Sequence, residues 1–449
     1  MTLLDTSSVN VALPSVQNGL HLSAGDVSWV VAGYALAFGL ALTPAGRLGD
    51  DFGRKRMFQV GLTLFVATSA FTGAATNTTW LVLGRVLMGL AAGMLNPQVM
   101  GIIQQLFTGP ERNRAFGLYG ATVGLSTAVG PLLGGLLLQW ADGAGGWRWI
   151  FWVNVPVGIG ALVAAAVLLP GERPHEVRRT PDLVGMLLLG LGVTATLLPL
   201  VQAGKTGTPQ WWLLIVAIVA LPAFVLWERR RSDRGRAVLV NLDLLRVRSF
   251  ASGTVLATVY FAGSTGIPLV LALFFQQGLG YTPLQAGLGV LPFATGLALA
   301  PIIGSRLLNR AGRGLVVAGM VMVAVGIGVT ALLASPQGSG AASLIAPLFL
   351  AGCGSGLVIS PNQTLTLRDV PSADAGGASA LLQTGQRIGS SIGMALTGAL
   401  FAGALSQSPG EFHAAAARGL LGVVGLVVLA LLLAVGDLLV PVNGRRNRA

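Results

Sequence analysis

Charged residues, cysteine and histidine are all scarce in this chain of 449 residues. Charged side chains make up 10% of it, whereas a soluble protein carries roughly 25%. The single cysteine, Cys353, excludes a disulfide framework and a cysteine metal site, and three scattered histidines give no metal cluster. The sequence also lacks a Gly-x-x-x-x-Gly-Lys-Ser/Thr phosphate loop and a nucleophile with a histidine partner. We therefore expect no metal, no cofactor and no enzymatic activity.

Apolar residues and glycine are abundant instead. Hydrophobic residues make up 53% of the chain, the mean hydropathy is +0.75, and there are 64 glycines. Such a chain cannot cover itself with a polar surface, so it must lie in a lipid bilayer. The net charge of +12 raises the possibility of nucleic-acid binding. We reject that interpretation, because the basic residues fall in short loops between apolar segments and form no patch.

Apolar segments of about 20 residues are the sequence signal for membrane-spanning helices. Fourteen such segments follow one another along the chain. They cover residues 1–20, 26–46, 57–76, 79–106, 113–139, 147–169, 182–202, 211–228, 249–276, 283–308, 314–334, 341–366, 374–404 and 416–440. We predict an all-α integral membrane protein with 14 transmembrane helices.

The first segment is unusually polar, with Asp5, Asn10 and Gln17 among few strongly apolar residues. It resembles the outer half of a helix whose N-terminal half is missing. We therefore expect that the first helix is truncated and that Met1 is not the natural start. A short, poorly inserted first helix is the alternative.

Basic residues indicate the orientation. Of the 28 lysines and arginines, 23 lie after even-numbered segments or in the C-terminal tail. Cytoplasmic loops carry such an excess, so these loops face the cytoplasm and both termini of the intact protein are cytoplasmic. The densest charged run, Gly-Arg-Leu-Gly-Asp-Asp-Phe-Gly-Arg-Lys-Arg at residues 46–56, is expected to be a tight turn at that surface.

The sequence contains an internal repeat. Residues 46–54 recur in degraded form at 305–313, with Gly53 matching Gly312, and residues 87–98 recur at 350–361. The segments therefore divide 6 + 2 + 6. We expect an N-terminal six-helix bundle at 1–170, an inserted hairpin with its loops at 171–235 and a C-terminal six-helix bundle at 236–449. Parallel six-helix halves are typical of transporters that bind substrate between the halves.

Five motifs, at residues 4–14, 46–56, 83–93, 124–135 and 146–158, stand in order at the expected segments. Together they identify a resemblance to the major facilitator superfamily, and within it to the fourteen-span drug:proton antiporters of the EmrB/QacA type. The resemblance covers essentially the whole chain. It implies a plasma-membrane (inner-membrane) transporter that works by alternating access.

Asp5 and Arg85 are the candidate proton-coupling pair. A charge within a membrane span is costly and marks function by default. The resemblance implies that the acid at this position couples proton entry to export and that Arg85 is its partner. Two plainer interpretations remain: Asp5 lies at a solvated terminus, or backbone carbonyls alone satisfy Arg85.

A cytoplasmic gate is the second candidate site, formed by Gly46, Asp50, Gly53, Arg54 and Glu111. Asp50 and Arg54 are four residues apart, and Asp50 can face the positive end of a neighbouring helix. The resemblance implies that this charge latch closes the halves at the cytoplasmic side. An ordinary solvated turn is the alternative.

The remaining candidates lie deeper in the spans. The fifth segment carries the antiporter motif Gly124, Gly130, Pro131, Gly134 and Gly135, which permits either close helix packing or a hinge. Candidate residues of a substrate cavity are Asn10, Gln98, Asn154, Asn362, Gln386 and Arg387. Each of these polar residues can equally serve a contact between helices. Arg387 fits either an anionic substrate group or a ring of backbone carbonyls.

These observations predict a proton-coupled exporter of drugs or other small amphipathic molecules, acting as a monomer. An exporter of lipids, glycolipids or an endogenous antibiotic on the same fold is the alternative, and a non-transporting membrane sensor is a more distant one. With one acid inside the membrane, we expect neutral, monocationic or zwitterionic substrates.

Overall fold

The computed structural model of the chain describes residues 1–141, 145–171, 182–203, 210–236, 238–334, 341–371, 374–408 and 410–439. Those residues contain helices and connecting turns, without a β-strand. Ten of their helical segments are long and apolar enough to cross a membrane. Several basic residues that indicated the orientation lie outside the described residues; these are Arg173, Arg178, Arg179, Lys205, Arg445, Arg446 and Arg448.

Helices of the first part of the chain follow the predicted segments closely. They are α1 (Thr2–Leu20), α2 (Ala24–Phe52), α3 (Arg54–Gly73), α4 (Thr78–Leu106), α5 (Gly109–Trp140), the short η1 (Gly146–Arg148) and α6 (Trp149–Trp152), and α7 (Asn154–Leu168). We call α1 to α7 the N-group. Two further helices, α8 (Leu183–Ala203) and α9 (Leu213–Asp233), form a hairpin, and η2 (Leu242–Arg246) leads out of it.

The second part of the chain forms the C-group. It consists of α10 (Arg248–Ser264), α11 (Gly266–Leu273), the π-helical turn η3 (Phe274–Gly278), α12 (Pro283–Ala311), α13 (Arg313–Leu333), η4 (Ala341–Leu344), α14 (Ile345–Thr366), α15 (Ala375–Gln407) and α16 (Phe412–Leu439). One predicted segment, 249–276, is thus built from α10, α11 and most of η3 in succession.

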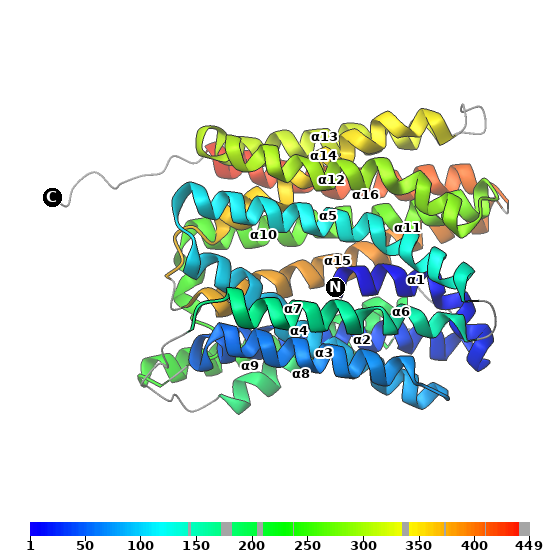
Figure 1. Cartoon of the computed structure of the whole chain (residues 1–449). Coiled ribbons are helices and arrows are strands. Elements are labelled where there is room, and N and C mark those ends of the chain that lie inside the picture. The colour runs from blue at the N-terminus through cyan, green and yellow to red at the C-terminus, as the bar shows by residue number, and fades with distance from the viewer. Residues whose placement is uncertain are drawn as a thin grey trace.

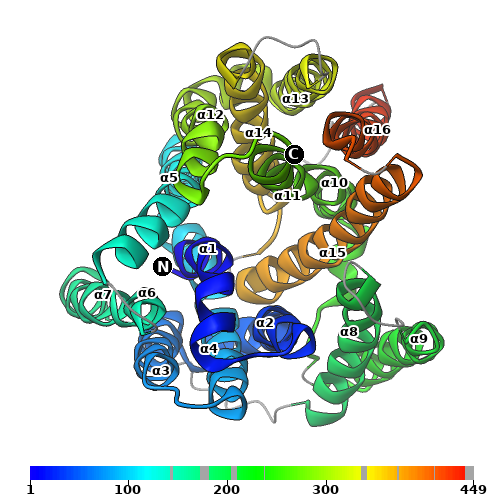
Figure 2. The same ribbon diagram turned by 90° about the vertical axis from the view of Figure 1, so that its right-hand side faces the viewer.

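The long helices lie side by side along one direction (Figure 1), and an end-on view separates the two groups (Figure 2). The groups touch where α5 meets α12 and where α2 meets α15. The hairpin α8–α9 lies at the periphery, where α8 contacts α2 and α15. One cluster of buried apolar side chains lies within residues 9–151 and another within 256–434, so each group has its own core.

The charged run at residues 46–56 departs from the expected tight turn. Helix α2 continues through it to Phe52, and the chain reverses at a single residue, Gly53, before α3 begins at Arg54. Gly53 has φ 98°, a conformation that favours glycine. The charged side chains remain on helical turns, where Arg47 pairs with Asp51 at 3.2 Å across i,i+4. The prediction of a turn over the whole run was therefore wrong.

Helices α2 and α12 share their boundary chemistry, as the sequence repeat suggests. Each begins with a capping box, Ser23 with Asp26 in α2 and Thr282 with Gln285 in α12. Each ends at a glycine with positive φ, and Gly312 of α12 has φ 51°. The same local signals thus start and stop the corresponding helix of both groups.

Helix packing depends on glycine at particular positions. In α15, a Cβ added at Gly393 would overlap the backbone of Ala262 in α10, whereas one at Gly398 meets nothing within 4 Å. We expect Gly393→Ala to lower the melting temperature of the detergent-purified protein, because overpacking costs about 1–3 kcal/mol.

Gly398→Ala is the matched control in the same helix. It should leave the melting temperature unchanged or raise it, because alanine is the better helix former by about 1 kcal/mol. Equal melting temperatures for the two variants would contradict the close α10–α15 contact.

Candidate functional site

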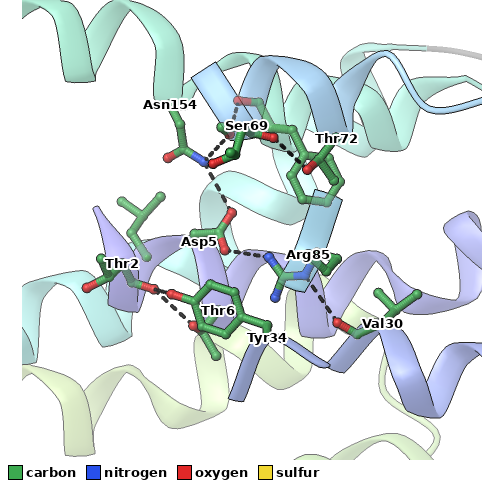
Figure 3. Close-up of polar contacts among 12 residues, drawn as sticks. Thr2, Asp5, Thr6, Val30, Tyr34, Ser69, Thr72, Arg85 and Asn154 are labelled. Carbon is green, nitrogen blue, oxygen red and sulfur yellow. Dashed lines mark hydrogen bonds and ion pairs between the residues drawn. The ribbon is translucent and has the colours of Figure 1, made fainter. Parts of the chain in front are cut away.

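Asp5 and Arg85 meet inside the N-group (Figure 3). An oxygen of the Asp5 carboxylate lies 2.8 Å from Nη1 of Arg85, which α4 supplies. The side chains are 0% and 2% exposed, respectively. Asp5 is therefore not a solvated terminus. The two charges are 80 positions apart in sequence, and the packing of α1 against its neighbours brings them together.

The second oxygen of Asp5 accepts a hydrogen bond from Nδ2 of Asn154 at 3.2 Å. The same amide nitrogen lies 3.1 Å from Oγ of Ser69 (Figure 3). Ser69 in turn donates to the Phe151 carbonyl at 2.8 Å. Asn154, which the sequence analysis placed among the cavity residues, is thus engaged with the buried acid. Both carboxylate oxygens have a donor, as a buried carboxylate requires.

Arg85 is held from three directions. Besides Asp5, its Nε donates to the Val30 carbonyl at 3.2 Å, and its guanidinium carbon lies 4.2 Å from the centre of the Tyr34 ring. Both interpretations of Arg85 therefore apply in part, since it has an acidic partner and a carbonyl. A carbonyl and an aromatic face can keep a guanidinium partly satisfied when its acid becomes neutral. The network, which we call the acid network, combines α1, α2, α3, α4 and α6–α7.

Asp50 and Arg54 form the second cluster, at the α2–α3 reversal. Nη2 of Arg54 lies 2.8 Å from Asp50 Oδ1, and Nη1 donates to the Gly101 carbonyl of α4. Asp50 also accepts the backbone N–H groups of Gly376 at 3.1 Å and Gly377 at 3.0 Å. These N–H groups belong to the first turn of α15, so the carboxylate sits at the positive end of a C-group helix. Asp50 thus ties the two groups together.

Close approach of α2 and α15 at this point depends on Gly46. A Cβ there would lie 2.6 Å from the Gly376 carbonyl oxygen, which is too close for any other residue without a shift of a helix. Glu111, the other expected member of the gate, is exposed near the start of α5, and the described residues form no ion pair with it. The structure therefore brings together Gly46, Asp50, Gly53 and Arg54, but not Glu111.

A related contact joins the groups at the repeat position. Asn309 of α12, which aligns with Asp50, accepts a hydrogen bond from Asn113 in the second turn of α5 at 2.8 Å. Asp50 likewise joins α2 to the start of α15, through backbone N–H groups instead of a side-chain amide. We call the two contacts together the clasp. The repeat of residues 46–54 at 305–313 aligns Asn309 with Asp50, but nothing in a linear sequence indicates which helix Asn309 faces.

Further contacts between the groups lie at the same end of the helices. Gln104 donates to the Leu367 carbonyl at 2.8 Å, and the hydroxyls of Thr43 and Thr384 are 3.3 Å apart. A buried apolar cluster surrounds them, drawn from both groups and from η2; its members are Met100, Phe116, Leu244, Phe250, Ala257, Leu367, Val370, Ala378 and Leu382. The groups are therefore sealed together at the end that carries the clasp.

The glycines of α5 serve close packing. A Cβ at Gly124 would lie 2.5 Å from the Ala298 nitrogen of α12, and one at Gly130 or Gly134 would press on Ser7 or Ser8 of α1. Gly135 makes only ordinary contact with Leu284. Helix α5 continues unbroken through Pro131, from Gly109 to Trp140. The structure thus shows the packing role of this motif, and the hinge stays a prediction.

The other cavity candidates have separate positions. Gln98 donates to the Ala45 carbonyl at 2.7 Å between α4 and α2, and Asn362 donates to the Gly253 carbonyl at 3.0 Å between α14 and α10. Both are contacts between helices of one group. Asn10 is exposed on α1, and Gln386 is buried in α15. Arg387 differs from all of these, because it reaches across from α15 to the Phe38 ring of α2 at 4.2 Å.

Known proteins resemble this chain over most of its length. The sequence profile of the family described as Major Facilitator Superfamily matches residues 1–394. A Streptomyces coelicolor protein named probable actinorhodin transporter is 38% identical over 425 residues, 93% of this chain and 73% of that protein. The tetracenomycin C resistance and export protein of Streptomyces glaucescens is 32% identical over 411 residues, 90% of this chain and 74% of that protein.

Solved structures agree on the fold. The crystal structure of the human organic anion transporter MFSD10 (TETRAN) superposes with a TM-score of 0.68 over 96% of both chains. At 14% identity this likeness concerns the fold alone.

Loss of the Asp50 carboxylate should loosen the sealed end. In a Cys353→Ser background, a reporter Gln383→Cys lies at the buried contact with Met100 between the groups. We expect Asp50→Ala to raise the rate at which a maleimide labels this cysteine, because the N–H groups at the start of α15 lose their acceptor.

Asp51→Ala is the matched control, since Asp51 is adjacent and pairs only within α2 with Arg47 among the contacts described here. It should leave the labelling rate unchanged. An unchanged rate in Asp50→Ala as well would show that the clasp does not hold the groups together.

Proposed function

Because the chain belongs to the Major Facilitator Superfamily, we propose that it exports small amphipathic molecules across the plasma membrane in exchange for protons. The predicted all-α fold of this superfamily is confirmed, and the chain is a membrane transporter, not an enzyme. Proton exchange, the direction of transport and the substrate are the proposed parts.

The proposed architecture is that of the fourteen-span EmrB/QacA branch, with spans arranged 6 + 2 + 6. Ten described helices meet the length and apolarity of a span, and α1, α3, α8 and α9 would supply the other four. The bundles would be residues 1–170 and 236–449, with the hairpin between them at 171–235. The separate cores of the two groups support this division. Both termini of the intact protein and the clasp would face the cytoplasm, and the protein would work as a monomer.

The acid network is the observation that carries the proton coupling. Asp5 is fully buried and holds Arg85 by an ion pair of 2.8 Å. A proton that binds Asp5 neutralises it and removes the charge partner of Arg85, which then keeps the Val30 carbonyl and the Tyr34 ring. Since Asp5 contacts α4 through Arg85 and the sixth span through Asn154, its charge state changes how three helices of the N-group hold together.

Alternating access would follow from this switch and the clasp. In the conformation described here the groups are sealed at the clasp end. Release of the clasp would allow the N-group and C-group to rock, so that a site between them opens to the cytoplasm instead. Movement of a substrate outward and a proton inward needs both ends to open in turn. Asp5, buried in this conformation, would exchange its proton only after such an opening.

The names of the relatives favour one substrate range. Two similar proteins are named for actinorhodin transport and for tetracenomycin C resistance and export. Export of an antibiotic is therefore the form of the proposal that they support best. An exporter of lipids or glycolipids on the same fold is the alternative, and a change in envelope lipids on deletion would favour it.

Everted membrane vesicles test the proposal directly. With an imposed acidic interior, vesicles that contain the protein should accumulate members of a panel of aromatic amphipathic compounds of net charge +1, 0 and −1. Asp5→Asn should reduce this accumulation to the level of vesicles without the protein, because the amide cannot take up a proton.

Asp51→Asn, which removes a carboxylate at the end of α2 outside the acid network, is the control and should accumulate the same compounds. Accumulation by Asp5→Asn equal to that of the unmodified protein would place the proton site elsewhere. Failure of the unmodified protein to accumulate any compound would contradict the exporter proposal itself.

A further inference from the structure

Arg387 is a half-buried cation that has no acidic partner among the described residues. It lies 12 residues inside α15, about 18 Å from the first residue of that helix at 1.5 Å per residue. The hydrocarbon core is about 30 Å thick, so this depth is well inside the membrane. A charged side chain at such a depth is expensive and marks a functional site by default.

The two deep arginines of the interior differ in how they are satisfied. Arg85 has Asp5, the Val30 carbonyl and the Tyr34 ring. Arg387 has the Phe38 ring, 4.2 Å from its guanidinium carbon, and within the described part of the chain no ion pair or hydrogen bond involves it. A ring of backbone carbonyls, one of the two interpretations that its sequence position allowed, is therefore not what holds it.

Its surroundings supply aromatic rings in place of an acid. Two phenol groups, those of Tyr34 and Tyr119, lie near it. Tyr34 and Phe38 stack on each other one turn apart on α2, with centroids 6.2 Å apart. Arg85 lies over the first ring and Arg387 over the second. The five N–H donors of Arg387 thus lack the anionic acceptor that a guanidinium binds best.

The guanidinium of Arg387 is accessible because of where it lies relative to the sealed end of the two groups. One turn closer to the clasp, Gln383 and Thr384 are buried against Met100 and Thr43 of the N-group. Arg387 itself is half-buried, although it faces α2 of the other group. The closed layer between the groups therefore ends just below Arg387, and its guanidinium is the first charged group of α15 above that layer.

We infer that Arg387 binds an acidic group of the transported molecule, so that the substrates of this protein are amphipathic organic acids, including zwitterions. This inference replaces the neutral and monocationic substrates that the sequence led us to expect. The guanidinium would hold a carboxylate, or another ionised oxygen acid, through paired N–H donors while the substrate lies above the sealed layer. This inference rests on the proposed exporter function, because it takes the molecule bound at Arg387 to be the one that is exported. It does not depend on proton coupling through Asp5.

The test uses matched acids and esters, because a methyl ester keeps the shape of a carboxylic acid and removes its charge. A series of aromatic carboxylic acids, beginning with anthraquinone-2-carboxylate, and their methyl esters would be measured for binding to the detergent-purified protein and for uptake into everted vesicles. The unmodified protein should bind the acids about tenfold or more tightly than the esters, as expected for a hydrogen-bonded charge pair.

Three variants of Arg387 separate charge from packing. Arg387→Gln should remove the preference for the acid and leave ester binding unchanged. Arg387→Lys, which keeps the charge and loses the planar fork, should retain part of the preference. Arg387→Glu should reverse it in favour of an aromatic amine of the same ring system. Arg310→Gln, an exposed arginine near the end of α12, is the matched control and should behave as the unmodified protein.

Each outcome decides the inference separately from the exporter proposal. Acid-selective binding that requires Arg387 supports the inference even if no uptake occurs. The absence of uptake would contradict the exporter proposal only. Equal binding of acids and esters, or no binding of either, overturns the inference, and uptake of the esters would then leave export standing. Loss of acid and ester binding together in a folded Arg387→Gln protein would also overturn it, because the role would then be structural. Binding of chloride at Arg387 without binding of any organic acid would also overturn the inference, because Arg387 would then be a site for an inorganic ion only.

Discussion

The ion pair of Asp5 with Arg85 is the interaction on which the rest of the N-group depends. A membrane span offers no water to either charge, so each must find its partner in the protein. The partners come from α1, α2, α4 and the sixth span, and Ser69 of α3 completes the set through Asn154. In the proposed mechanism a proton on Asp5 would undo the pair, so the same interaction that binds these helices would make their packing sensitive to protonation. A structural ion pair and a proton switch would then be one set of contacts.

The second constraint is the internal repeat, which gives the two groups related surfaces. Asp50 of α2 binds the start of α15, and Asn309 of α12 binds the second turn of α5. Only one of the two contacts carries a charge. Arg54 pairs with Asp50, whereas its counterpart Arg313 pairs with Asp437 of α16 at 2.8 Å. The clasp is therefore asymmetric in strength although it is symmetric in position, and its charged half lies in the group that holds the acid network.

Much of this arrangement could be predicted from the sequence, because the length of an apolar segment and the basic residues of a loop are both visible in a short stretch of residues. The helices, the repeat and the spacing of Asp50 and Arg54 follow from local patterns. The pairing of Asp5 with Arg85 was implied by the resemblance to the superfamily. The helical continuation of α2 to Phe52 could not be predicted, because a run of glycines and charged residues has the composition of an open turn. The hydrogen-bond partners of Asn154 and Gln98 could not be predicted either. A polar residue in a span has the same sequence pattern whether it faces a substrate, a buried acid or a neighbouring helix, and only tertiary packing distinguishes these cases.

The central claim is that Asp5 takes up a proton and that this protonation is linked to substrate. An infrared difference titration of the purified protein measures it, because a protonated carboxyl group has a carbonyl band that a carboxylate and an amide lack. A band should appear as the pH falls, be absent in Asp5→Asn, and shift its midpoint when a transported compound is bound, as linkage requires. A band that persists in Asp5→Asn, or a midpoint that substrate leaves unchanged, would contradict the account.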